Sequence, residues 1–195
     1  GTGEITSDGD TTADITIGGD GTITFTSSGA VGVSGTELNT VVSNLGVSTT
    51  TGDVFIDNTG ALVISGAFSV GANNLTLENT AGVTQTGAIT AGGLELLGTG
   101  SYILNAANAV DSLAANITEE LQFTNNADLD VTTVAGDGTV GITTTSDNVT
   151  IAIGTNELTV SQVINAVNGA VSLTSDTIEI NAEVTGNGGI TLPPN

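Results

Sequence analysis

The chain lacks basic side chains entirely: its 195 residues contain no Lys, Arg or His, against 21 Asp and Glu, for a formal net charge of −21. This absence excludes every intrachain ion pair with Lys or Arg, so each carboxylate must be solvated, hydrogen-bonded or bound to a metal ion. It also excludes Schiff-base chemistry and histidine acid–base catalysis. Such a polyanion cannot neutralise phosphates, so we expect no nucleic-acid partner.

Sulfur and most aromatic side chains are also missing: the chain has no Cys, Met or Trp, one Tyr and four Phe. Without Cys there can be no disulfide and no thiolate chemistry. No apolar run approaches the roughly 20 residues of a membrane-spanning helix, and no basic segment opens a signal peptide. We therefore expect no transmembrane segment.

The residues that are present form a repeating pattern. Short runs of Val, Ile, Leu and Ala alternate with Thr, Ser or Glu, which is the period-two pattern of a strand with one buried face. In Leu75–Leu77 we expect both leucines to point inward and Thr76 to point to solvent. Copies return at offsets of 19–22 residues. The clearest runs are 54–56, 62–64 and 68–70, their copies 75–77, 83–85 and 88–90, and, later, 149–151, 158–160, 171–173 and 178–180.

Three short strands per repeat cannot form a closed sheet alone, so each must pair with its counterpart in the next repeat. The sequence therefore predicts an all-β fold, a right-handed parallel β-helix (β-solenoid) of about nine coils of 19–22 residues with three short strands each. Gly and Asn at corners such as Gly71, Asn73 and Asn168 suit tight turns, and we expect Asn amides to form ladders between coils. We interpret residues 1–195 as a single domain, either a segment of a longer repetitive chain or a subunit of a stacking filament.

Two regions depart from the period. Thr36–Val47 has apolar residues at helical spacing, so either a helical turn or an irregular corner fits it. Ala106–Glu120 is rich in Ala between two strand-like runs, and we expect one coil to be enlarged there.

Five runs share a style of short strands and polar corners: residues 113–118 (LAANIT), 121–129 (LQFTNNADL), 141–151 (GITTTSDNVTI), 156–165 (NELTVSQVIN) and 176–192 (DTIEINAEVTGNGGITL). They resemble the filamentous-haemagglutinin-type repeats of large bacterial surface and secreted adhesins. The resemblance covers most of residues 50–192 and includes no invariant motif. It implies a right-handed parallel β-helix that is exported across an outer membrane and acts in adhesion, biofilm formation or cell-surface architecture. It assigns no functional residue.

Two Gly-Asp-Gly turns are candidate calcium sites. Residues 19–21 and 136–138 are similar to fragments of calcium-binding β-roll repeats, in which carboxylate and carbonyl oxygens suit Ca²⁺. Asp20 and Asp137 are therefore the metal candidates, and Ca²⁺ is the one cofactor considered. No complete nonapeptide copy occurs, so a plain turn, with diffuse cation screening of the anionic surface, is the competing interpretation.

Carboxylates and Tyr102 are the only acid–base groups. They permit one enzyme class, a two-carboxylate polysaccharide hydrolase. Glycan binding would instead need exposed aromatic rings, for which Tyr102 and Phe123 are the candidates. The close acidic pairs are Asp8 and Asp10, Glu119 and Glu120, and Asp128 and Asp130.

The pattern as a whole favours a non-catalytic extracellular module, a spacer or fibre-forming segment of a bacterial adhesin or surface filament. Its expected partner is itself, through end-to-end stacking or tandem solenoid segments, because uniform negative charge opposes sideways bundling while apolar coil ends can stack. A face that binds glycans or a host surface is the alternative, and the hydrolase is the third hypothesis. The expected location is extracellular or on the bacterial cell surface.

Overall fold

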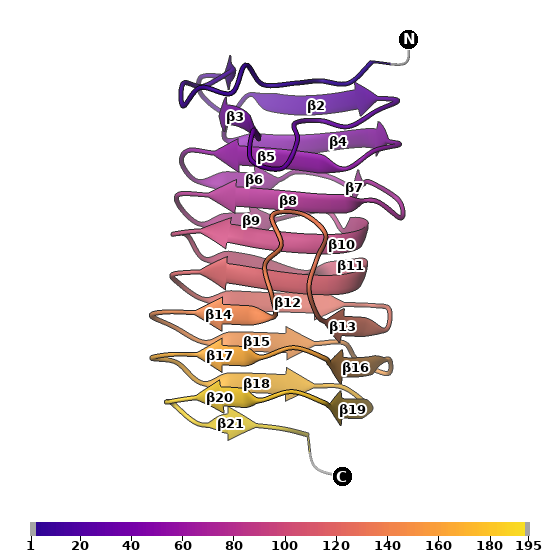
Figure 1. Ribbon diagram of the computed structural model, residues 1–195, viewed down its shortest axis with the longest axis vertical. Helices are drawn as coiled ribbons and strands as arrows, with labels where there is room; N and C mark the ends of the chain where they lie inside the picture. The colour runs from indigo at the N-terminus through magenta and orange to yellow at the C-terminus, as the bar shows by residue number, and fades with distance from the viewer. Residues whose placement is uncertain (1–2, 194–195) are drawn as a thin grey trace.

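The computed structural model describes residues 3–193, apart from the side chains of residues 47–50. The strands stack in parallel into a β-solenoid of about eight turns, close to the nine expected (Figure 1). Among the described residues no helix occurs that could cross a bilayer. The alternating runs of apolar and polar residues form the strands of this stack.

The strands form three rows that run along the stack. The first row contains β2 (Thr22–Ser27), β4 (Asn44–Thr50), β6 (Leu62–Ile64), β9 (Val83–Gln85), the start of β11 (Tyr102–Ile117), β12 (Leu121–Asn125), β15 (Val149–Ala152), β18 (Val171–Thr174) and β21 (Ile190–Thr191). The second contains β7 (Phe68–Ser69), the start of β10 (Ile89–Gly98), the middle of β11, β13 (Leu129–Val131), β16 (Glu157–Val160) and β19 (Thr177–Ile180). The third contains β1 (Ile15–Thr16), β3 (Leu38–Val41), β5 (Val54–Asn58), β8 (Asn74–Asn79), the ends of β10 and β11, β14 (Ile142–Thr144), β17 (Ile164–Ala166) and β20 (Val184–Gly186).

Ladders of inward aliphatic side chains form the core. In the third row the register aligns Ile56, Leu77, Leu96, Ala115 and Ile142, each at most 1% exposed. Full burial of one large aliphatic side chain stabilises a fold by about 1.5–3 kcal/mol. Short strands can persist here because every turn covers the apolar side chains of the turn before it.

A polar ladder lies beside the apolar ones. The Asn58 amide accepts a hydrogen bond from Thr40 Oγ1 at 2.9 Å and donates one to Asn79 Oδ1 at 2.9 Å, and Asn58 and Asn79 are fully buried. Buried amides must be paired to offset their desolvation. This contact confirms the expected Asn pairing between coils.

The two departures from the period resolve differently. Thr36–Val47 contains strands β3 and β4 around a tight corner, so the corner interpretation is confirmed and the helical one is wrong. The enlarged coil expected at Ala106–Glu120 is also wrong, because β11 runs through this region as one strand and Tyr102 pairs with Leu121, 19 residues later.

The enlarged turn is the following one. Leu121 pairs with Val149, 28 residues later, and the additional residues form an excursion between β13 and β14. We call residues 132–141 the strap. In Figure 1 the strap is the orange loop that rises from β13 and β14 towards β8.

Candidate functional site

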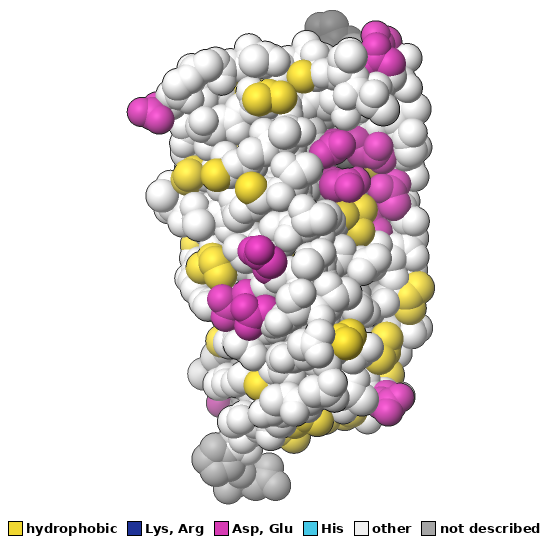
Figure 2. Space-filling model, turned by 90° about the vertical axis from the view of Figure 1, so that its left-hand side faces the viewer, with side chains coloured by type: hydrophobic (Ala, Val, Ile, Leu, Met, Phe, Trp, Pro, Cys, Tyr) yellow, Lys and Arg dark blue, Asp and Glu magenta, His cyan; other side chains and the backbone are white. Residues whose placement is uncertain are grey.

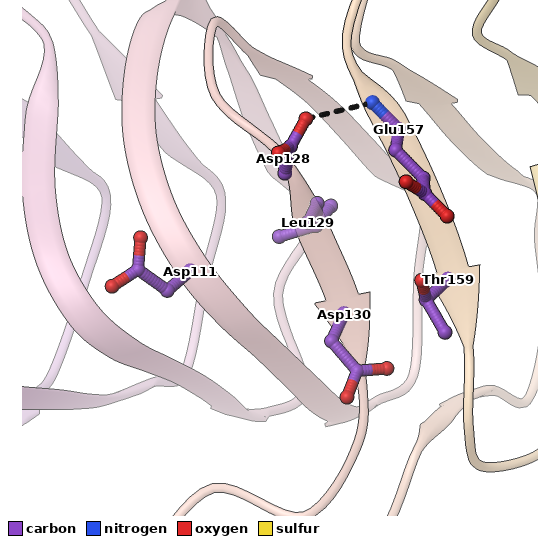
Figure 3. Close-up of a pocket in the computed structure, with 6 residues that line it drawn as sticks. All are labelled: Asp111, Asp128, Leu129, Asp130, Glu157 and Thr159. Atoms are coloured by element: carbon purple, nitrogen blue, oxygen red, sulfur yellow. Dashed lines mark hydrogen bonds between the residues drawn. The ribbon is translucent and has the colours of Figure 1, made fainter. Parts of the chain in front are cut away.

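A shallow acidic groove lies on the second row, where Asp128 and Asp130 meet two further carboxylates. Its volume is about 380 Å³, and its lining residues are Asp111, Asp128, Leu129, Asp130, Glu157 and Thr159 (Figure 3). The register places Leu129 beside Leu158 and Asp130 beside Thr159, so adjacent strands β13 and β16 supply most of the lining. The sequence predicted the Asp128–Asp130 pair, while Asp111 and Glu157 join it only through the stacking of coils.

The groove contains one constrained and one unsatisfied carboxylate oxygen. Asp128 Oδ1 accepts a hydrogen bond from the backbone N–H of Glu157 at 2.9 Å. Asp130 Oδ1 is buried and has no hydrogen-bond partner. Carboxylate oxygens are ligands for hard cations and can act as general acids or bases. Within residues 3–193, however, no group of three or more Asp or Glu residues has an arrangement that could hold a metal ion.

The two calcium candidates occupy separate turns. Asp20 is exposed just before β2, and its backbone carbonyl accepts a hydrogen bond from Asn44 Nδ2 at 3.0 Å. Asp137 lies at the tip of the strap, where its Oδ1 accepts a hydrogen bond from Ser34 Oγ at 2.7 Å. Both turns thus have structural contacts of their own, and Ca²⁺ binding at either stays a prediction.

Glu95 is the residue that sequence reasoning missed. It is fully buried in β10 beneath the strap, and its carboxylate accepts three hydrogen bonds. Oε2 accepts from Thr76 Oγ1 at 2.9 Å and from the Asp137 N–H at 2.7 Å, while Oε1 accepts from the Thr139 N–H at 2.8 Å. Since a buried charge is costly unless it is well hydrogen-bonded, these contacts are what allow a carboxylate here.

The strap also corrects the expectation for Thr76. Its side chain was expected in solvent, yet Thr76 is fully buried. The register aligns Phe55, Thr76, Glu95 and Ala114 across four strands of the third row, and all four are at most 6% exposed. The signal for a cover was the 28-residue spacing between the strand-like runs at Leu121 and Val149, which no neighbouring turn shares.

A second group of carboxylates lies at the ends of β5 and β8. Asp57 and Glu78 are register partners. Burial raises the pKa of both, and for Glu78 the charges of Asp57, Glu37 and Asp137 raise the pKa further. Figure 2 shows acidic side chains gathered on this side of the molecule with no basic side chain among them.

The remaining acidic pairs belong to turns. Asp8 Oδ1 accepts from the Asp10 N–H at 3.2 Å, and hydrogen bonds from Thr12 lower the pKa of Asp10. Glu119 and Glu120 lie between β11 and β12, where Glu120 Oε1 accepts from Gln122 Nε2 at 2.9 Å. These contacts fix the local direction of the chain at each turn.

The aromatic platform expected for glycan binding is wrong. Tyr102 and Phe123 are at most 1% exposed, because both lie on the inward side of the first row. The Tyr102 hydroxyl donates its one proton to a hydrogen bond shared between the carbonyls of Leu77 at 2.8 Å and Leu97 at 2.7 Å, and burial raises the pKa of Tyr102 well above its ordinary value. The other three aromatic residues, Phe25, Phe55 and Phe68, are at most 6% exposed.

Comparison with known proteins adds no relative. No family model matches the chain, and neither a curated protein nor a solved structure matches it. The resemblance to filamentous-haemagglutinin-type repeats therefore stays a prediction from the residue pattern.

Proposed function

We propose that this chain is an extracellular structural module, a spacer or fibre-forming segment of a bacterial adhesin or surface filament, and that it is not catalytic. The observation that carries the proposal is the apolar surface of the last described coil. Ile180, Ile190 and Leu192 are 45–49% exposed there. Such a surface favours lengthwise association with another solenoid coil.

The register shows why these positions are apolar. Ile180 is the partner of Val160, and Ile190 is the partner of Val171, and both valines are fully buried by the coil that follows them. The last coil thus repeats the side chains that elsewhere receive a neighbour. At about 25 cal/mol per Å² of apolar area, covering these residues would stabilise a stacked pair.

The charge distribution supports the same function. A chain with 21 carboxylates and no cation repels parallel copies along its sides. The exposed Ile180, Ile190 and Leu192 of the last described coil are uncharged, so contact between them and another coil is not opposed by charge repulsion. Rods that stack lengthwise and stay apart sideways suit a spacer or filament at a cell surface.

Electron microscopy and sedimentation of matched variants test the proposal. We expect the wild-type chain to form longer particles with increasing concentration, with an axial repeat of about 4.8 Å. Ile190→Lys should shorten them, because a charge at the coil end would be desolvated on stacking. Val41→Lys, which alters a 37%-exposed valine on β3, is the control and should not. Discrete rods at every concentration would refute fibre formation.

The acidic groove favours a second candidate, the carboxylate-dependent polysaccharide hydrolase. Its buried, unsatisfied Asp130 Oδ1 is the specific observation. Incubation with a panel of polysaccharides tests it, with Asp130→Asn as the variant and Glu119→Gln as an exposed control. Cleavage that Asp130→Asn abolishes and Glu119→Gln retains would overturn the structural proposal; we expect no cleavage by any of the three.

A further inference from the structure

The strap leaves the solenoid and returns to it without interrupting a ladder. At its base the Gly141 N–H donates to the Thr132 carbonyl at 3.1 Å, and Thr133 bridges Val140. On either side, β13 still pairs with β16 and β14 with β17. The two ends of the strap stay bonded to β11, because the Thr132 N–H donates to the Leu113 carbonyl at 3.2 Å and the Ala115 N–H donates to the Gly141 carbonyl at 2.9 Å. Residues 133–140 can therefore lift while these hydrogen bonds and the ladders on either side stay in place.

Beneath the strap lies an apolar patch on the outside of the third row. Phe55, Ala114 and the strap's own Val134 are at most 6% exposed, yet none of them belongs to the cluster that fills the interior of the solenoid. Ala114 is the register partner of Glu95, so it lies on the same outward side of the sheet. The strap covers this side of the sheet around Glu95 and Gly93, where an added Cβ would lie 2.8 Å from Val134 Cγ1, while the turn at Gly32 lies against Phe55.

Three side chains of the solenoid hold the strap by hydrogen bonds. Ser34 Oγ donates to Asp137 Oδ1 at 2.7 Å, Asn74 Nδ2 donates to the Ala135 carbonyl at 3.4 Å, and Glu95, the fully buried one of the three, makes two. Glu95 accepts the N–H groups of Asp137 and Thr139, which fixes the tip of the strap, and Gly136 lies directly over it. A Cβ at Gly136 would overlap Glu95 Oε2 and Thr76 Oγ1. Closing the strap also places the Asp137 carboxylate near that of Glu78, a like charge that opposes closure.

We propose that the strap is a latch, which opens and closes over the outer side of the third row at Glu95 and Ala114 while the solenoid stays folded, and that Glu95 is the side chain that holds it closed. This inference goes beyond the structural role proposed above and does not depend on stacking. Closed, the latch keeps an apolar area on the side of the rod out of water. Open, it exposes that area and the Glu95 carboxylate.

The absence of native Cys makes single-cysteine labelling a direct test. Ala114→Cys places a thiol beneath the strap, Ala115→Cys places one in the interior core, and Ala109→Cys places one on the exposed surface of the same strand. We expect a thiol reagent to label Cys at 109 fastest, at 115 only on global unfolding, and at 114 at an intermediate rate.

Removing one acceptor oxygen of Glu95 should accelerate labelling of the thiol at position 114 and leave the other two positions unchanged. Glu95→Gln replaces one acceptor oxygen by an NH₂ group, which leaves a strap N–H without a partner, so the rate for Ala114→Cys should rise roughly 5-fold to 100-fold. Glu119→Gln makes the same change on an exposed residue and should leave the rate unchanged. The rate for Ala115→Cys should stay unchanged in both backgrounds.

A glycine variant and hydrogen exchange keep the proposal testable if Glu95→Gln does not fold. Gly136→Ala should open the strap in the same way, with Gly18→Ala, where a Cβ meets nothing, as its control. In the unmodified chain the Asp137 and Thr139 amides should exchange faster than that of Ile142, which donates to Val163 in the adjacent turn. Equal exchange of these three amides, or equal labelling at 114 and 115 in every background, would overturn the latch.

Discussion

Removing the amide of Asn58 is the sharpest test of what holds successive coils together. Oδ1 accepts from Thr40 Oγ1 at 2.9 Å and from the Val42 N–H at 3.1 Å, while Nδ2 donates to Asn79 Oδ1 at 2.9 Å and to the Gly60 carbonyl at 3.3 Å. Asn58→Ala removes all four hydrogen bonds. Because Asn58 is fully buried, solvent water does not reach the groups that lose their partner.

The magnitude follows from the partners that are left behind. The Val42 N–H and Asn79 Oδ1 lose their partners in a buried setting, and each such loss costs about 1–3 kcal/mol. We therefore expect Asn58→Ala to lower the free energy of unfolding by about 2–6 kcal/mol, a large part of the roughly 5–15 kcal/mol typical of a domain. In a chain of this size, where each kcal/mol shifts Tm by about 2–4 °C, that corresponds to a fall in Tm of about 4–24 °C.

Urea unfolding followed by circular dichroism measures the effect. Asn126→Ala is the matched control, because Asn126 is exposed at the turn after β12, and it should change stability by no more than about 0.5 kcal/mol. A folded Asn58→Ala variant whose stability equals that of the control would refute the reasoning that the amide ladder joins the coils.

Two further predictions concern ionisable groups. Tyr102→Phe should destabilise the fold by about 1–3 kcal/mol in the same urea assay, since the carbonyls of Leu77 and Leu97 lose a buried donor; no change would mean that other groups satisfy them. The raised pKa values of Asp57 and Glu78 mean that the folded state binds their protons more tightly than the unfolded state does. Their ionisation is therefore destabilising at neutral pH, and stability should rise as pH falls through the raised pKa values of Glu78 and Asp57 towards their ordinary values of 4.5 and 3.8. Asp57→Asn with Glu78→Gln should flatten this part of the stability–pH curve, and an unchanged curve in the double variant would contradict the assignment.

The solenoid could be predicted from the sequence because its information is local and repeated. Leu94–Leu96 and its partner run Leu75–Leu77 show the same alternation 19 residues apart, and parallel pairing is the way to bury both. The strap could not be predicted, because the contact of Glu95 with Asp137 and Thr139 spans more than 40 residues. In the sequence, Glu95 lies between Leu94 and Leu96, so the alternation predicts that it points to solvent like the middle residue of any other strand.

The same limit explains the wrong prediction for Tyr102 and why the sequence did not place Asp111 and Glu157 beside the Asp128–Asp130 pair. Which way Tyr102 points depends on where β11 begins, and a shift of one residue reverses the side chain. Asp111, Asp128 and Glu157 come together only once the register of three turns is known. The Asp128–Asp130 pair was visible because its two members are two residues apart in the sequence, on either side of Leu129.

The stacking of strands also determines how the rod would respond to tension. The first and last described coils lie at opposite ends of the stack, so a force along its axis pulls each ladder apart one coil at a time (Figure 1). A coil of about 20 residues that contributes roughly 4.8 Å of length when folded releases up to about 70 Å when extended. A chain built this way would lengthen in steps under load, and each step would absorb work before the next coil yields.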